Sequence, residues 1–428
     1  MIKDAIVNHL ESNNMIKDSQ HGFRSGRSCL TNLLYFLEDV TKTLDEGGSV
    51  DVVYLDFSKA FDKVPHKRLI TKLSRYNISN KFVDWIENWL SDRKQRVVLN
   101  GCKSDWLAVT SGVPQGSVLG PVLFIIYIND LDDGIASSAL KFADDTKVYC
   151  NVSSRDNATV LQLDLNKMYD WSVKWQMLFN ADKCKCLHLG YNNSGTDYYI
   201  AGKQVVNVQS ERDLGVTLGK SLDGSLHCAK VVGTANRILS SIKRTFTCNS
   251  LCNITKLYKS LVRPHLEYCC QAWRPYLQKD VDNLEKVQRR ATRLIPEIAS
   301  LSYSERLGRC NLLSLEMRRL RADLIEVFKI VKGFEGIDPN YFFKFVGNAR
   351  TRGHNLRIYK QNNRLDIRKY FFSQRVITEW NNLPLEAVSA TSINGFKKAI
   401  HPLFEKVRGL YISQRRLPAP VLKAPSAR

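Results

Sequence analysis

The sequence predicts an α+β protein, and three observations support that fold class. Short segments rich in β-branched and aromatic residues, at 49–57 and 140–150, have the composition of buried strands. Apolar residues recur at helical spacing between and around these segments. Beyond residue 226 the pattern is mainly helical and basic. The first half therefore combines strands with helices, and the second half adds a helical region.

The first elements follow from local signals in chain order. Ser28 can cap a helix whose leucines recur at helical spacing, and "DEGG" then ends it. The apolar segment "SVDVVYLDF" predicts a strand that ends near Asp56. The expected elements up to residue 112 are a helix at 29–45, a strand at 49–57, helices at 65–76 and 81–92, and a hairpin formed by 95–101 and 104–112.

A glycine-rich and proline-rich loop, "GVPQGSVLGP", leads into the apolar helix "VLFIIYINDL". The next segment, "LKFADDTKVYC", alternates apolar residues around two aspartates and predicts a hairpin with those aspartates at or beside its tip. A long helix is expected at about 157–178. Its apolar residues, which we interpret as core rather than as a base-stacking platform, are Leu161, Leu165, Met168, Trp171, Trp175 and Leu178.

The net charge of +21 over 428 residues lies almost entirely in residues 226–428. That half is a candidate for binding a polyanion, although a solvated basic surface without a ligand is the alternative. A predicted helix at 283–295 places Lys286, Arg289, Arg290 and Arg293 largely off its apolar face.

The longest apolar run, "VLGPVLFIIYI", falls well short of the roughly 20 residues that a membrane helix needs, and the N-terminus has no signal-peptide pattern. We therefore expect a soluble intracellular protein without membrane contact. Eleven cysteines without regular spacing favour a reducing compartment. Cys248, Cys252, His265 and Cys269 approach the spacing of a small zinc site, but packing in an apolar helical segment is the preferred interpretation, so zinc is not expected.

The adjacent carboxylates Asp144 and Asp145 raise a physical question, because two charges 4 Å apart repel by roughly 4 kcal/mol near a protein surface. Alone, the pair is typical of a turn. Asp56, however, ends another apolar strand, and neighbouring strands would bring the three carboxylates together. Divalent ions need such a cluster, and a pair of ions about 4 Å apart assists displacement at phosphorus. The pattern therefore indicates phosphoryl or nucleotidyl transfer.

Several segments together resemble the reverse transcriptases of non-LTR, LINE-type (jockey-like) retrotransposons. The palm motifs are matched by "VVYLDFSKAFDKVPH", "SGVPQGSVLGPVLFIIYINDL" and "KFADDTKVY", in the order of the family. Further matches are "DSQHGFRSGRSCLTNLL" in the fingers, "FNADKCKCLHLG" and "ERDLGVTL" in the later palm, and "LYKSLVRPHLEYCCQAW" and "FFSQRVITEWNNLP" downstream. The resemblance covers most of the chain.

The resemblance implies a right-hand polymerase fold with an antiparallel palm sheet. The domains would be partial fingers and palm at 1–225, a helical thumb-like region at 226–300, a basic extension at 301–414 and a disordered tail at 415–428. The activity would be RNA-directed DNA polymerisation with two Mg²⁺ or Mn²⁺ ions, an RNA template, a DNA primer and dNTPs, in the nucleus or cytoplasm.

The resemblance also implies site residues. Asp56 and Asp144 would be the principal catalytic metal ligands, assisted by Asp145. Phe61 would select deoxynucleotides by blocking the 2′-hydroxyl, or it is a core residue. The other implied contacts are Phe57, Gln115, Gly116 and Lys183 for the nucleotide, and Arg24, Arg27, Leu214, Gly215, Lys286, Arg289, Arg290 and Arg293 for nucleic acid.

The sequence departs from the family pattern before residue 20, where neither an endonuclease nor the first part of the fingers is found. Two hypotheses follow: an active RNA-directed DNA polymerase, or a truncated, catalytically weak product that only binds nucleic acid. A viral-type RNA polymerase is a third, and Phe61 argues against it.

Overall fold

The computed structural model describes residues 1–347 and 354–406, so the tail predicted at 415–428 lies outside the described residues. The chain forms two compact units. The first contains residues 1–32 and 47–209, and the second contains 33–46 and the chain from 210 onward. The functional division expected after residue 225 stays a prediction.

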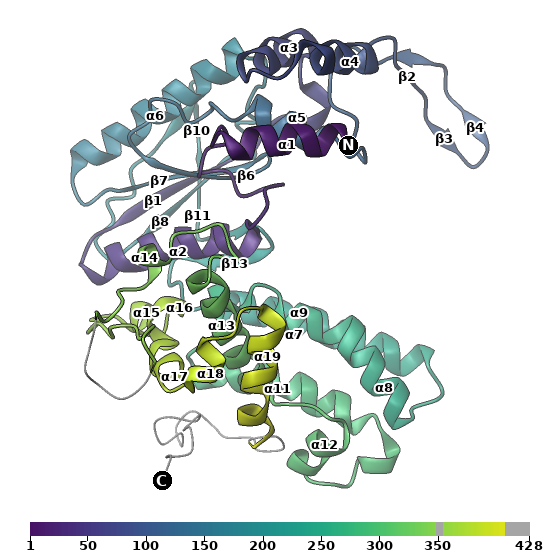
Figure 1. Cartoon of the computed structure of the whole chain (residues 1–428), viewed down its shortest axis with the longest axis vertical. Coiled ribbons are helices and arrows are strands. Elements are labelled where there is room, and N and C mark those ends of the chain that lie inside the picture. Colours follow the sequence, from purple (N-terminus) through teal and green to yellow (C-terminus); the bar gives the residue numbers. More distant parts are fainter. Residues whose placement is uncertain (348–353, 407–428) are drawn as a thin grey trace. The chain divides into compact units, whose positions relative to one another are not determined.

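The first unit is built on a five-stranded sheet in the order β11-β8-β1-β7-β6 (Figure 1). The central strand β1 pairs antiparallel with both β7 and β8, and β11 adds parallel to β8. The predicted strand and the predicted hairpin around the aspartates are confirmed. The strands are β1 (Val50–Leu55), β6 (Ser138–Phe142), β7 (Asp145–Asn151), β8 (Lys185–Leu189) and β11 (Val206–Val208).

Helices complete the core of this unit. The helix α5 is apolar on all sides and almost wholly buried, as its sequence requires. Its side chains Leu123 and Phe124 belong to the same core as Val53 and Val148 of the sheet. The helices are α1 (Ile2–Ser12), α3 (His66–Arg75), α4 (Asn80–Leu90), α5 (Gly120–Tyr127) and α6 (Arg155–Lys174), and a small hairpin is formed by β9 (Tyr199–Ile200) and β10 (Lys203–Gln204).

Two predicted elements of this unit, the long helix and the hairpin after α4, differ from the structure in their details. The helix predicted to reach residue 178 ends at Lys174, and Gln176 has a positive φ of 56° that redirects the chain. Leu178, expected in the core, is therefore 47% exposed. The predicted hairpin after α4 is present, but it projects as an exposed arm (Figure 1) made of β2 (Lys94–Gln95), β3 (Val98–Leu99), β4 (Cys102–Lys103) and β5 (Leu107–Ala108).

The second unit is mainly helical, as predicted. It contains most of α2 (Cys29–Asp45), the hairpin of β12 (Ser210–Asp213) and β13 (Val216–Gly219), and a series of helices. These are α7 (Ser225–Thr245), α8 (Leu251–Leu257), α9 (Arg263–Glu267), α10 (Cys270–Trp273), α11 (Gln278–Arg293), α12 (Tyr303–Arg309), α13 (Leu315–Val331), α14 (Pro339–Phe342), α15 (Asp366–Lys369), α16 (Phe372–Arg375), α17 (Ile377–Asn381), α18 (Leu385–Val388) and α19 (Ile393–Glu405).

Contacts within the second unit tie its first segment to its last. Glu38 on α2 forms an ion pair with Arg368 on α15, and both side chains are only 5% exposed. The Arg368 guanidinium also donates to the hydroxyl of Thr41. No helix within residues 1–347 and 354–406 is long and apolar enough to cross a membrane.

Candidate active site

The strand register brings Asp56 and Asp144 to the same end of the sheet. Leu55 pairs with Thr146, so the end of β1 lies beside the turn between β6 and β7. That turn consists of Ala143, which has a φ of 54°, and Asp144. Burial raises the pKa of the half-buried Asp144 carboxyl, and the negative charge of Asp56 adds to the rise. The two predicted carboxylates are therefore electrostatic neighbours.

Lys183 reaches the same place from the segment before β8. Its Nζ lies 3.6 Å from Asp56 Oδ2, and its side chain is 67% exposed. The backbone fixes this approach, because Asn180 N donates to the Asp56 carbonyl at 2.7 Å and Lys183 N donates to the Asn180 carbonyl at 2.9 Å. Within the described part of the chain, Asp56 Oδ2 is buried and accepts no hydrogen bond. A buried carboxylate oxygen in this state can accept a ligand.

The carboxylates fit a hard cation only with help from other ligands. Among the described residues, no group of three or more His, Cys, Asp or Glu side chains is arranged to hold a metal ion. Asp145 is exposed as the first residue of β7. Mg²⁺ often binds one or two carboxylates and completes its coordination with water and substrate phosphate. Asp56 and Asp144, with the unsatisfied Oδ2, match that requirement.

The cysteine and histidine positions considered for zinc lie elsewhere. Cys248 and Cys252 are exposed, and Cys269 is partly buried. His265, which we expected to pack inside a helical segment, is exposed. The packing expectation is wrong for this histidine because α9 turns its Leu266 face inward instead.

The two phenylalanines after β1 differ in their surroundings. Phe57 is 5% exposed and stacks on Phe179 with ring centroids 4.6 Å apart, so its ring lies in the core, and its contact with the nucleotide stays a prediction. Phe61 is only partly buried and stacks on Phe124 of α5 at 4.3 Å. Its carbonyl accepts a hydrogen bond from Val113 N at 2.8 Å. Phe61 therefore borders the glycine-rich loop.

The glycine-rich loop has an open tip. Gln115 Nε2 donates to Asp62 Oδ1 at 2.8 Å, which ties the loop to the segment that carries Phe61. Gly116 has a φ of 80°, and no atom lies within 4 Å of the position a Cβ would take. Glycine at this position satisfies a backbone conformation that other residues rarely adopt. The space above it is open to another molecule.

Gln20, which our sequence analysis did not select, holds the turn that carries Asp144. Gln20 is fully buried, and its Oε1 accepts hydrogen bonds from Ala143 N at 3.0 Å and from Gly22 N at 2.7 Å. A Cβ at Gly22 would lie 2.4 Å from Ala143 N, so only glycine allows this approach. No periodicity marked Gln20, and the available signals were its place in the matched segment "DSQHGFRSGRSCLTNLL" and its position two residues before a glycine.

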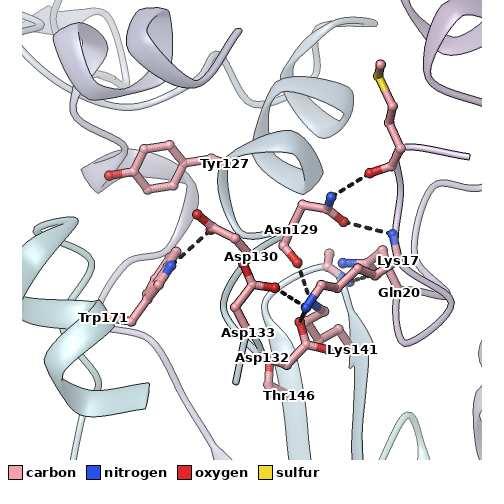
Figure 2. A network of polar contacts seen from close by, with 12 residues as sticks. Lys17, Gln20, Tyr127, Asn129, Asp130, Asp132, Asp133, Lys141, Thr146 and Trp171 are labelled. Carbon is pink, nitrogen blue, oxygen red and sulfur yellow. Dashed lines mark hydrogen bonds and ion pairs between the residues drawn. The ribbon is translucent and has the colours of Figure 1, made fainter. Parts of the chain in front are cut away.

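A buried network joins β6, the strand that leads into this turn, to two other segments of the chain (Figure 2). Lys141 is fully buried on β6, and its Nζ donates to Asp132 Oδ1 at 2.6 Å and to the Asn129 carbonyl at 3.0 Å. Lys17 Nζ reaches the same Asp132 oxygen at 3.1 Å. Burial acts to raise the pKa of Asp132, but the charge and the hydrogen bond of Lys141, together with the charge of Lys17, lower the pKa below its usual value. The N-terminal segment, the segment that follows α5, and β6 are thereby joined.

Arg24 and Arg27 contribute to the same N-terminal segment. Arg27 Nη2 lies 2.9 Å from Asp18 Oδ1, and Arg24 Nη1 lies 3.6 Å from it and donates to the Lys17 carbonyl at 2.8 Å. The Arg24 side chain is 17% exposed, and the Arg27 side chain is 7% exposed. The structure thus gives both arginines a role in holding residues 17–27, and their contact with nucleic acid stays a prediction.

The remaining predicted contacts lie in the second unit. Leu214 and Gly215, with φ of 44° and 87°, form the turn between β12 and β13, and the Tyr268 hydroxyl donates to the Leu214 carbonyl at 3.1 Å. On α11, the residues Leu284, Val287 and Ala291 are buried as predicted. Of its basic residues, Lys286, Arg290 and Arg293 are exposed, whereas Arg289 lies over the Tyr303 ring at 4.8 Å.

Comparison with known proteins agrees with the geometry. The family described as "Reverse transcriptase (RNA-dependent DNA polymerase)" matches residues 1–218. The chain is 27% identical over 310 residues to the probable RNA-directed DNA polymerase from transposon X-element of Drosophila melanogaster, covering 69% of this chain and 34% of that protein. It is 28% identical over 313 residues to the RNA-directed DNA polymerase from mobile element jockey of Drosophila funebris, with the same coverage.

The chain therefore spans about a third of the length of the curated relatives it matches. Among solved structures, it is similar to telomerase from Candida albicans in complex with a fragment of telomeric RNA, at 11% identity and a TM-score of 0.42, covering 80% of this chain and 54% of that chain. Because this score is low, the fold assignment rests on the family match and on the observed sheet. The predicted resemblance to jockey-like elements is confirmed.

Proposed function

Because the chain belongs to the reverse transcriptase (RNA-dependent DNA polymerase) family, we propose that it extends a DNA primer on an RNA template by nucleotidyl transfer. The observation that carries the proposal is the convergence of Asp56 and Asp144 beside Lys183, where Asp56 Oδ2 is buried without a hydrogen-bond donor in the described residues. Neighbouring carboxylates with an oxygen that lacks a hydrogen-bond donor are suited to hold cations.

Asp56 and Asp144 would hold the divalent ions that this family generally uses, Mg²⁺ or Mn²⁺, with Asp145 as an exposed neighbour at the start of β7. Such ions lower the energy of the charged oxygens at the attacked phosphorus. Lys183 brings a positive charge to the same carboxylate, and its exposed ammonium group can contact the departing pyrophosphate.

The neighbouring residues would select and position the nucleotide. Phe61 lies next to the glycine-rich loop with part of its ring exposed, so it can restrict the space at the 2′ carbon. Gly116 leaves room for close approach of the nucleotide or template, and Gln115 fixes the loop through Asp62. The basic surface of the second unit would contact phosphates, which contributes affinity without reading sequence.

Primer extension with the purified chain tests the proposal. Wild type is expected to extend a DNA primer on an RNA template with Mg²⁺, and Asp144→Asn is expected to abolish extension. Asp84→Asn, on the exposed face of α4, is the matched control and should extend normally. Primer-template binding without extension by both wild type and Asp144→Asn would contradict the polymerase proposal and leave nucleic-acid binding as the function.

Thermal melting in EDTA shows whether Asp144→Asn still folds. Because folding raises the pKa of Asp144, its charged form destabilises the native protein at neutral pH, and this penalty disappears as the pH falls and the group is protonated. The neutral variant should therefore melt at the same temperature as wild type, or at a higher temperature, at pH 7. A lower melting temperature would mean that lost activity reflects misfolding.

A further inference from the structure

A cavity of about 590 Å³ lies within the second unit, and the catalytic carboxylates take no part in it. Its walls come from the segment after α10, from α13, from residues 360–363 and from the α15–α17 region. Cavities of 300–1,000 Å³ are the usual size for a small ligand or a single nucleotide.

One wall of the cavity is aromatic and apolar. The rings of Tyr276 and Tyr370 stack with centroids 5.0 Å apart and an interplanar angle of 9°, and both residues are half-buried. Met317 and Leu320, both buried, add apolar surface to the cavity. Flat aromatic surfaces of this kind stack on nucleobases.

Basic groups also line the cavity. Lys360 and Lys369 are exposed, and Lys369 Nζ lies 5.2 Å from the centre of the Tyr370 ring. Arg274 and Arg375 both bind the fully buried Asp323, at 2.8 Å each. One buried carboxylate thus fixes two guanidinium groups. Together with the two lysines, these arginines outnumber the acidic residues that line the cavity. A phosphate is a suitable ligand for the two rim lysines.

Amide side chains are concentrated in the same cavity. Gln361, Asn362, Asn363 and Gln374 all line it. Gln374 is 4% exposed, yet its two side-chain contacts, with Asn363 Nδ2 and with Ser373 Oγ, are both 3.5 Å long, which is at the limit of a hydrogen bond. A buried amide with such weak partners can bind better donors and acceptors, such as a base edge.

We propose that this cavity binds one nucleotide of a single-stranded nucleic acid, with the base beside the Tyr276–Tyr370 pair and the amide groups, and the phosphate at Lys360 and Lys369. Aromatic, amide and basic groups are required together by a nucleotide, whereas an acidic peptide would need only the basic ones. The inference does not depend on the proposed polymerase activity, because it concerns binding at residues of another unit.

The test measures binding of labelled ten-nucleotide single strands, of RNA and of DNA, by fluorescence anisotropy in EDTA, so that no catalysis is required. The double variant Lys360→Gln/Lys369→Gln is expected to weaken binding about tenfold. The matched control Lys332→Gln/Lys398→Gln removes the same charge from exposed positions of the same unit and should have a much smaller effect. Equal losses in both double variants would overturn the proposal in favour of a diffuse basic surface.

Changes at the aromatic wall separate base stacking from charge. Tyr370→Leu should weaken single-strand binding about tenfold, and Tyr370→Phe, which keeps the ring, should bind like wild type. Duplexes of the same length should not show the difference between Leu and Phe, since their bases are already stacked. A duplex that shows the same difference, or polyglutamate that competes as well as the oligonucleotide, would overturn the proposal. If Tyr370→Leu loses more affinity for the RNA strand than for the DNA strand, the nucleotide bound in the cavity belongs to RNA.

Discussion

Replacing Gln20 tests whether a residue outside the carboxylate cluster determines its geometry. Gln20→Met keeps the side-chain length and removes the acceptor of Ala143 N and Gly22 N, which lie 3.0 and 2.7 Å away. Each buried N–H left without a partner costs about 1–3 kcal/mol. Gln20 Nε2 is itself buried without a hydrogen bond in the described residues, and its removal offsets about 1 kcal/mol. For the two N–H groups together, the net loss is about 1–5 kcal/mol.

In a compact unit of this size, such a loss lowers the melting temperature by about 2–20 °C. The effect on catalysis should be larger than the stability loss implies at assay temperature, because displacing a reacting group by about 1 Å can cost about a hundredfold in rate. Thermal melting and primer extension at 20 °C, on folded protein, measure the two effects separately. Gln20→Glu retains an acceptor for both N–H groups and should preserve more of each property than Gln20→Met.

Gln95→Met on the exposed hairpin arm is the matched control and should leave both measurements unchanged. The reasoning would be refuted if Gln20→Met melted within a degree or two of wild type and extended primers at the same rate. If Gln20→Met lost stability but kept full activity per folded molecule, Gln20 would support the fold without positioning Asp144.

Phe61→Ala should raise incorporation of ribonucleotides relative to deoxynucleotides, and Phe61→Tyr should not; unchanged sugar selectivity in Phe61→Ala would remove its gating role. His227 Nδ1 accepts a hydrogen bond from Thr217 N at 3.1 Å, and burial lowers the pKa of His227 to about 4. Between pH 6.5 and pH 4 the imidazole is therefore protonated mainly in the unfolded chain, so the free energy of unfolding of the second unit should fall by about 3 kcal/mol over this range. His227→Gln should flatten this dependence in urea unfolding at several pH values. Arg368→Ala leaves the buried Glu38 carboxylate unpaired and should destabilise the second unit by about 3–5 kcal/mol in the same assay; a change below 1 kcal/mol would contradict a structural role for the pair.

Local signals were sufficient for the elements that carry the candidate site. The strand before Asp56 and the hairpin around Asp144 are marked by composition and alternation within a few residues, so both were predicted with nearly correct bounds. The helix at 29–45 was predicted at its observed bounds for the same reason. Its inclusion in the second unit was not predictable, because that depends on the pair between Glu38 and Arg368, which are 330 positions apart.

Side-chain surroundings were the least predictable feature. Phe57 and Phe61 are four residues apart in one motif, yet one ring lies in the core and the other borders the open loop. Leu178 was misplaced because a helix ended one turn early. Gln20 and Lys141 escaped notice because their roles depend on partners that other segments supply, such as Ala143 and Asp132. Sequence spacing describes one element at a time, whereas these contacts join several.

The arrangement behind Asp144 explains how an unfavourable turn persists. Ala143 is held at a positive φ, which costs about 1 kcal/mol or more in a residue other than glycine, and the neighbouring carboxylates repel. Neither the backbone conformation of Ala143 nor the repulsion of the carboxylates favours this turn, so its geometry must be imposed by the surrounding structure. Gln20 does this from a buried position, where its hydrogen bond to Ala143 N is costly to break, and the buried Lys141–Asp132 pair holds the strand that leads into the turn. The carboxylates are thereby kept close before any cation binds, and the free energy released on binding the cation need not be used to bring them together.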